Sequence, residues 1–250
     1  NEIYISRLSS GISDIFNNII EINQSFSFET GNTDWIHYEI DNLEIDFANH
    51  WWDPQSSGST LGIISDSTWI ETSSEIINLL YDSNYSMEVN YGWNLASSEW
   101  LIRIYLSGGS PREVIFNDSK IMQAYVFGDG SGNSFRFCVD DNLPNSSSSN
   151  HEVSPWFAID WVGWKLVSWD MSTDGTGSWI GDGNLDGNMR FDSFQLKYNQ
   201  GQSQFGKIYI DDFRIVDNVI LSTLENNFES AVNLGRNFPN PFNSSTEISF

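Results

Sequence analysis

The sequence predicts an all-β protein built as an antiparallel β-sandwich, and two observations carry this prediction. Hydrophobic and polar residues alternate over much of the chain, as in Ser86–Trp93, where every second residue is Met, Val, Tyr or Trp. Clusters of Gly, Asn, Asp and Ser, which favour turns, separate one alternating run from the next. Short strands at such spacing, with no helical period between them, are typical of a β-sandwich.

The alternating runs are the expected strands, taken here in chain order. In the first, Ser86–Trp93, the apolar residues share one face and polar or small residues take the other, as in a half-buried strand. The pattern recurs in Trp100–Leu106, Ile121–Phe127, Phe135–Asp140, Trp156–Asp160, Trp164–Asp170, Phe191–Tyr198 and Lys207–Val216. Helix-like spacing occurs in Ile12–Ile22, although Asn17, Asn18 and the β-branched isoleucines disfavour a helix there.

Composition and charge exclude several classes of partner. The chain has 250 residues, enough for one large β domain with tails, and its 34 acidic and 11 basic side chains give a net charge of −23. Such a charge repels phosphate groups, so nucleic acid and anionic membrane surfaces are not expected partners. The 11 Trp, 17 Phe and 9 Tyr supply the apolar surface of a core, which argues against a disordered chain.

The single cysteine and the hydropathy pattern argue against a disulfide-bonded, thiolate-metal or membrane-spanning protein. Cys138 can form neither an internal disulfide nor a thiolate metal site, so we expect a small buried side chain. No apolar stretch approaches the roughly 18 residues that a membrane span needs, so membrane insertion is not expected. No signal peptide opens the sequence, and we expect a soluble piece of a longer protein.

Composition divides the chain into four segments. Residues 1–42 are predicted to be an N-terminal extension or the tail of a preceding module, and residues 43–217 to be the sandwich. Because the alternation stops after Val216, residues 218–232 are expected to be a polar linker. Residues 233–250 contain two prolines flanked by asparagines, which would hold that segment extended.

The last segment contains the most specific string in the chain, Asn-Phe-Pro-Asn-Pro-Phe-Asn-Ser-Ser-Thr, which begins at Asn237. It resembles the opening of the C-terminal sorting domain of type IX secretion substrates, usually Asn-Tyr-Pro-Asn-Pro-Phe-Asn-Pro-Ser-Thr. Phe238 replaces the Tyr and Ser244 replaces the third Pro. The resemblance covers only residues 233–250, the start of such a domain. It implies export by the type IX secretion machinery to the medium or the cell surface.

Three segments in the middle of the chain carry a resemblance through their order and spacing: Tyr125–Phe137, Ile159–Asp170 and Gly206–Phe213. Together they resemble the galactose-binding-like β-sandwich, a jelly roll, found in many carbohydrate-binding modules of secreted glycoside hydrolases. The resemblance implies an accessory domain without catalytic activity that binds sugar. Because folds of this kind also host purely structural modules, function has to be argued from individual residues.

The number of tryptophans favours a sugar-binding surface. A sandwich of this size rarely buries eleven indoles with satisfied N–H groups, so some are expected to be exposed. Flat aromatic rings stack on the apolar C–H face of a pyranose, while polar side chains bond its hydroxyls. Loop tryptophans and nearby polar residues make up the predicted carbohydrate-binding set: Trp51, Trp52, Asp53, Gln55, Arg103, Arg136, Trp179 and Gln195.

An acidic loop before Phe191 has the oxygen spacing of an EF-hand-type calcium loop. Its first three candidate ligands stand at positions one, three and five, followed by a glycine at six and a backbone carbonyl at seven. The predicted ligands are Asp182, Asn184, Asp186, Asn188 and Asp192. Ser193 holds the twelfth position, so Asp192 would have to substitute from the eleventh. A turn rich in Asp, Asn and Gly without metal is the alternative.

A second calcium site is implied by the resemblance to carbohydrate-binding modules. Those modules often hold a structural calcium between an acid near the first strand and an acid in the last strand. Asp211 and Asp212 match the last strand, and Asp46 is the candidate near the first strand because Ala48 stands where the family has a glutamate. A domain start at Phe28 would restore that acid, and a solvated strand end is the alternative for Asp211 and Asp212.

Two other functions stay open. The same sandwich could act as a structural or adhesive module of a surface assembly, and its tryptophans would then be buried. The run Glu39–Glu44 fits the Glu-x-Asp-x-x-Glu signature of laminarinase-type glycoside hydrolases, in which a bulged strand aims two carboxylates into a cleft. Asn42 stands where that family has a hydrophobic residue and the rest of its pattern is missing, so catalysis is not expected.

The sequence as a whole predicts a non-catalytic carbohydrate-binding module of a larger secreted bacterial protein. It would bind a neutral polysaccharide through exposed tryptophans, and calcium, where bound, would fix loops without touching the sugar. The net charge of −23 argues against strongly anionic polymers unless calcium bridges them.

Overall fold

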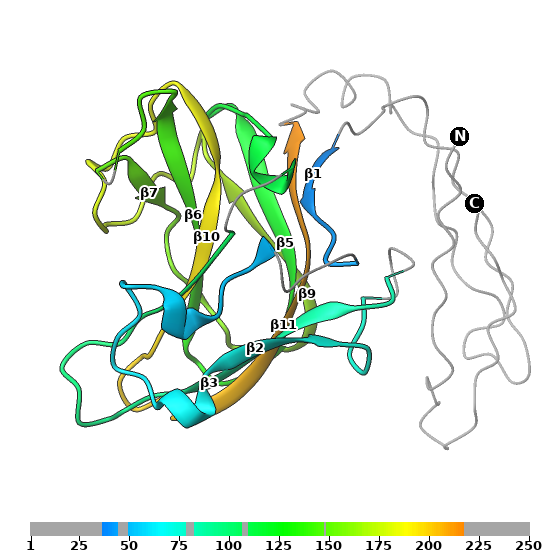
Figure 1. The fold of residues 1–250 in the computed structure, drawn as a ribbon, viewed down its shortest axis with the longest axis vertical. Helices are drawn as coiled ribbons and strands as arrows, with labels where there is room; N and C mark the ends of the chain where they lie inside the picture. Colours follow the sequence, from blue (N-terminus) through cyan, green and yellow to red (C-terminus); the bar gives the residue numbers. More distant parts are fainter. Residues whose placement is uncertain (1–36, 45–49, 79–82, 107–109, 148, 218–250) are drawn as a thin grey trace, which may run out of the picture.

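The computed structural model describes residues 37–44, 50–78, 83–106, 110–147 and 149–217. Two antiparallel sheets face each other across a single core (Figure 1). This arrangement confirms the predicted all-β antiparallel sandwich. The predicted linker, the sorting-domain segment, the helix-like run Ile12–Ile22 and Asp46 lie outside the described residues.

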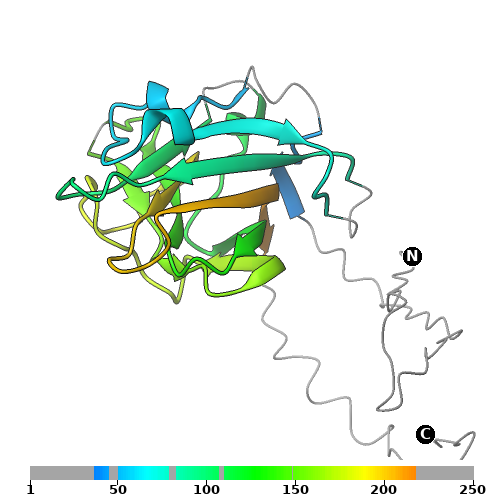
Figure 2. The ribbon, with the colours of Figure 1, turned by 90° about the horizontal axis from the view of Figure 1, so that it is seen from below.

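The first sheet has six strands in the order β2-β3-β11-β5-β9, with β1 also paired to β11. Its strands are β1 (His37–Asp41), β2 (Trp69–Ser73), β3 (Ser86–Gly92), β5 (Lys120–Asp129), β9 (Val162–Asp170) and β11 (Phe205–Asp217). The long strand β11 pairs with β3 along its first half and with β1 along its second half. Figure 2 shows β2 (cyan), β3 and β11 (orange) side by side.

The second sheet has five strands in the order β4-β10-β6-β7, with β8 also paired to β6. Its strands are β4 (Ile102–Tyr105), β6 (Ser134–Leu143), β7 (His151–Val153), β8 (Phe157–Ala158) and β10 (Asn188–Lys197). Three short 3-10 helices, η1 (Pro54–Ser56), η2 (Ser65–Ser67) and η4 (Ser110–Glu113), lie in the connections. Within the described ranges, no helix has the length and hydropathy that crossing a membrane requires.

All eight predicted runs contain strand residues, but three strands were not predicted. β1, β2 and β7 are short and lack a clear alternation; β2, for example, is largely exposed. Because β1 pairs with β11 from His37 onwards, the sandwich begins at residue 37 or earlier. This finding corrects the predicted boundary at residue 43.

The core is built from aromatic and aliphatic side chains of both sheets. Trp93 and Trp169 are fully buried, and Cys138 is buried as predicted. Burial raises the pKa of the Cys138 thiol, which keeps it unreactive.

Trp51 belongs to this core and corrects the prediction that it is an exposed platform. Its side chain is 3% exposed, and its ring centroid lies 5.1 Å from that of Phe213 and 5.8 Å from that of Phe194. The indole Nε1–H donates to Asp41 Oδ2 over 2.7 Å, which satisfies the buried polar group. Its neighbour Trp52 points the other way and is 44% exposed.

This pair of adjacent tryptophans gives a matched stability test. Trp51→Ala should lower the free energy of unfolding by about 3–5 kcal/mol, because it opens a cavity and leaves Asp41 without its donor. Trp52→Ala should change it by about 0.5 kcal/mol or less, as expected for a surface site. Urea unfolding followed by circular dichroism measures both, and losses of similar size would contradict the burial of Trp51.

Candidate functional site

The outer face of the second sheet carries one continuous row of polar side chains. Inward-pointing residues of β4, β6 and β10 are buried hydrophobics, so their neighbours along each strand point outwards. In the register of the sheet, Gln195 of β10 lies opposite Arg103 of β4 on one side and Arg136 of β6 on the other. Three residues of the predicted sugar-binding set are therefore direct neighbours.

Aromatic side chains gather at the β4 end of this row. The ring of Trp52 lies over that of Tyr105, with the centroids 4.9 Å apart. The guanidinium of Arg103 lies 4.7 Å from the Tyr105 centroid and 5.6 Å from that of Trp179. Trp179 also meets His151 edge to face at 5.8 Å. Arg103 thus contacts the rings of Tyr105 and Trp179, and Trp52 packs on Tyr105, so flat aromatic surfaces lie near hydrogen-bonding groups.

A second aromatic group lies at the β6 end of the row. The Arg136 guanidinium stacks 4.0 Å from the ring centroid of Trp156, and Lys197 Nζ lies 5.0 Å from the same ring. Arg136 Nε donates to Gln195 Oε1 over 2.8 Å, and its Nη1 donates to the Ser178 carbonyl over 3.1 Å. Burial lowers the pKa of Arg136 to about 10, so the side chain is charged at neutral pH.

Gln195, in the middle of the row, has an unused donor. The residue is fully buried, and its Nε2 has no hydrogen-bond partner among the residues that the structure describes. A buried amide nitrogen without an acceptor costs stability, so such a group is a candidate for contact with a bound hydroxyl.

Ion pairs hold the centre of the same face in place. Asp192 accepts from Arg103 Nη2 over 2.6 and 2.8 Å, and Asp140 accepts from Arg112 Nη2 over 2.8 Å and from Arg190 Nε over 2.9 Å. Burial acts to raise the pKa of Asp192, but Arg103 outweighs it and holds that pKa below its ordinary value. Asp192 is therefore an ionised partner of Arg103 rather than a ligand of the acidic loop.

Asp140, His151 and Asp192 also place one ligand-type atom each within 4.8 Å of one another. The three arginines around them already neutralise the two carboxylates, so a metal cation would gain little there. We interpret this cluster as a rigid, hydrogen-bonding floor of the face.

Asp53 and Gln55 build the loop that presents Trp52. Asp53 Oδ1 accepts from the Gln55 backbone over 2.8 Å and caps η1. Gln55 Nε2 donates to the carbonyls of Ser65 and Thr68 over 3.0 and 2.9 Å. These two predicted residues therefore position an aromatic ring.

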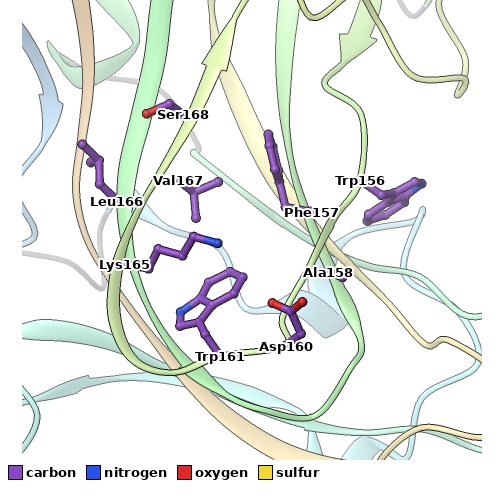
Figure 3. Close-up of a pocket in the computed structure, with 9 residues that line it drawn as sticks. All are labelled: Trp156, Phe157, Ala158, Asp160, Trp161, Lys165, Leu166, Val167 and Ser168. Atoms are coloured by element: carbon purple, nitrogen blue, oxygen red, sulfur yellow. The ribbon is translucent and has the colours of Figure 1, made fainter.

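A hollow of about 460 Å³ opens beside this face, between β8 and the edge strand β9 (Figure 3). Trp156 and Trp161 line it, and Lys165 Nζ lies 4.4 Å from the ring centroid of Trp161. The full lining is Trp156, Phe157, Ala158, Asp160, Trp161, Lys165, Leu166, Val167 and Ser168. The sequence prediction missed this site, although its lining comes from the single stretch 156–168, because strand alternation does not show that the turn between β8 and β9 leaves a hollow.

The acidic loop does not assemble the predicted EF-hand-type site. Asp182, Asn184, Asp186 and Asn188 are exposed, whereas Asp192 lies on the face described above. Asp182 Oδ1 accepts from the Asn184 backbone over 2.9 Å and closes a local turn. The described geometry fits the metal-free alternative.

The second predicted calcium site fits a cation better. Asp211 is 1% exposed, and its Oδ2 has no hydrogen-bond partner among the described residues. Burial raises its pKa to about 7, and the nearby Asp212 and Glu44 add to the rise. Asp212, which has a φ of 53°, turns instead towards Arg214, whose Nη1 lies 2.9 Å away. The buried Asp211 therefore lies within electrostatic reach of Glu44 and has no ion pair with any residue that the structure describes.

Glu44 sits in a fixed cradle near that site. Its carboxylate accepts from Ser83 Oγ over 2.8 Å and from the backbone N–H groups of Asn84 and Tyr85 over 2.9 and 3.0 Å. Burial acts to raise the pKa of Glu44, but these hydrogen bonds outweigh it and lower the pKa. A lowered pKa does not suit the acid of a glycosidase, which needs a raised one. Asp41, in the same signature, is committed to Trp51.

Comparisons with known proteins find solved structures that are similar in fold but not in sequence. No family model and no curated protein matches the chain. The family 11 carbohydrate-binding module of a cellulosomal cellulase of Clostridium thermocellum is 16% identical, with a TM-score of 0.49 over 74% of this chain and 96% of that one. A family 27 module of Caldicellulosiruptor saccharolyticus, solved with mannohexaose, is 11% identical, with a TM-score of 0.41 over 72% and 96%. A xylan-binding domain of family 22 is 9% identical, with a TM-score of 0.37 over 75% and 97%. At these values the likeness brings no site residue to this chain.

Proposed function

We propose that the outer face of the second sheet binds a polysaccharide with a neutral main chain. The row Arg103–Gln195–Arg136, with aromatic rings at both ends, carries this proposal. Sugar rings would stack on Trp52 and Trp179, and their hydroxyls would bond the row between them. The protein would act as a binding module without catalysis, and would hold a partner enzyme or a cell surface close to the polymer.

The rigidity of the face supports this function. Arg103 is already fixed by its ion pair with Asp192, and Arg136 by its bond to Gln195. Polar groups held in this way lose little conformational freedom when a ligand binds. The remaining cost is the ordering of the flexible glycan, so we expect modest affinity for short oligosaccharides and higher avidity for the polymer.

The exposure of Trp52 speaks against a purely structural module. Such a module is expected to bury its indoles, whereas Trp52 is 44% exposed on the proposed binding face. We further propose that the protein acts outside the cell, exported through the segment at residues 233–250 by the type IX machinery. That proposal stands on the sequence of the segment, which lies outside the described residues.

We also propose a structural calcium held by Asp211 and Glu44. Glu44 follows the end of β1 and Asp211 precedes the part of β11 that pairs with β1, so both acids lie at the same end of this pairing, and Glu44 would take the place expected of Asp46. When bound, calcium would supply the charge that the buried Asp211 carboxylate lacks. It would tie the start of the sandwich to its last strand and would not contact the sugar.

The sugar-binding proposal is tested by removing rings one at a time. Trp52→Ala and Trp179→Ala should each weaken binding about tenfold, or about 1.4 kcal/mol, because each removes one stacking surface. Trp69→Ala is the matched control, since Trp69 is comparably exposed but lies on the first sheet. Calorimetry with soluble β-glucan, xylan and mannan measures the affinities. Loss of binding in Trp69→Ala alone, or no binding to any polymer, would refute the proposal.

The calcium proposal is tested by thermal unfolding. Millimolar calcium should raise the melting temperature of the native protein above its value in EDTA, because a ligand that binds only the folded state stabilises it. Asp211→Asn should abolish this rise, and Asp182→Asn should leave it intact. If Asp182→Asn abolished the rise instead, the acidic loop would be the calcium site.

A further inference from the structure

The positive charges of the described chain are divided into two groups. Nine lysines and arginines lie in the described ranges, and six of them are within ion-pair distance of a carboxylate: Arg103, Arg112, Lys120, Arg190, Lys207 and Arg214. The other three, Arg136, Lys165 and Lys197, have no ion pair with any described residue. In a chain with 34 acids and 11 bases, three unpaired cations are unexpected.

All three unpaired cations lie against the same two tryptophans. Arg136 and Lys197 lie 4.0 and 5.0 Å from the ring centroid of Trp156, and Lys165 lies 4.4 Å from that of Trp161. Both tryptophans line the hollow between β8 and β9 (Figure 3). Lys165 lines the hollow itself, whereas Arg136 and Lys197 stack on the ring of Trp156 at its edge. Positive charges of this kind favour the binding of an anion nearby.

The burial of Arg136 strengthens this interpretation. Its side chain is 3% exposed, and its two protein acceptors, Gln195 Oε1 and the Ser178 carbonyl, are both neutral. The pKa of Arg136 is lowered mainly by burial, and no carboxylate raises it again. Buried charges are normally paired, so an unpaired one beside an open hollow indicates a missing anionic partner.

The lining of the hollow points to a sugar rather than to a small inorganic anion. It presents aromatic rings, the ammonium of Lys165 and the exposed carboxylate of Asp160. In Figure 3, Lys165 and Asp160 flank the ring of Trp161. A carboxylate such as Asp160 accepts hydrogen bonds from hydroxyl groups but repels a simple anion, so the ligand needs both a negative group and hydroxyls.

We infer that this hollow binds a hexuronate, a pyranose with a carboxylate, carried as a substituent on the neutral main chain. Its C–H face would stack on a tryptophan ring, its carboxylate would face Lys165, and its hydroxyls would face Asp160. The inference rests on the proposed polysaccharide binding and names its substrate class. It departs from the expectation of a strictly neutral ligand, because net charge describes the whole chain and not the field at one site.

The experiment uses monosaccharide probes, so that its result does not depend on the identity of the main chain. Methyl β-glucuronide and methyl β-glucoside differ in having a carboxylate or a hydroxymethyl group at C5. Titration into the full chain is followed by the NMR signals of the indole N–H groups. The glucuronide should shift the signals of Trp156 and Trp161 with an affinity at least about tenfold higher than the glucoside, and added salt should weaken it.

Paired variants separate the local charges from the net charge. Lys165→Met combined with Lys197→Met keeps the apolar stems and should reduce the preference for the glucuronide to about onefold. Lys120→Met is the control, because Lys120 is paired with Asp217 on the first sheet, and it should leave the preference unchanged. An unchanged preference in the double variant would overturn the inference. Equal shifts with sodium acetate would also overturn it, since the site would then recognise charge alone.

The outcomes distinguish this inference from the proposed function. If neutral polymers bind through Trp52 while glucuronide and glucoside behave alike, the hexuronate site fails and polysaccharide binding stands. If glucuronide shifts Trp156 and Trp161 but no polymer binds, the hollow is a hexuronate site and the polysaccharide proposal fails.

Discussion

The register of β10 between β4 and β6 is the constraint on which the candidate site depends. Phe194 and Leu196 of β10 face the core together with Ile102 and Ile104 of β4, so Gln195 between them must face outwards. A shift of β10 by one residue would move Phe194 and Leu196 to the surface and turn Gln195 into the core, away from Arg103 and Arg136. Packing of the hydrophobic core thus fixes the strand register, and the register alone places the polar row on the outer face.

The same constraint explains what the sequence could predict. Alternation identifies outward residues within a strand, which is why Arg103, Arg136 and Gln195 were expected as polar partners and lie in one row. Alternation could not show which of Trp51 and Trp52 is buried, because adjacent residues outside a regular strand have no periodicity. Only the packing of Trp51 against Phe213 in the structure shows it. The hollow beside β9 was also missed, although β8 and β9 follow each other in the chain, because alternation does not show that the turn between them leaves space next to Trp161.

Local backbone irregularities account for the remaining differences. The pairing of β11 with β5 shifts between Asp211 and Arg214, and Asp212 takes a positive φ of 53° inside this irregularity. As a result one acid of the pair is buried near Glu44 and the other turns to Arg214. A sequence of two adjacent aspartates does not show that both are buried or which of them faces Arg214. The acidic loop shows the opposite difference. Its oxygen atoms have the spacing of a calcium loop in the sequence, but in the structure Asp192 pairs with Arg103 and not with the loop.

Two kinds of charged residue lie on and beside the second sheet. Paired charges hold the face rigid, and unpaired positive charges attract negative groups of a ligand. Arg103 and Asp192 neutralise each other, and removing either would strand a buried charge, so this part of the face is fixed but adds little field. Lys197 on β10 and Lys165 on the neighbouring edge strand β9 contact tryptophan rings and have no ion pair with a described residue, so their charges face the solvent, whereas the unpaired Arg136 is buried beneath Trp156. A neutral chain is therefore best held at the paired end and a negative substituent at the unpaired end. A net charge of −23 conceals this difference, because it averages over surfaces that the ligand never meets.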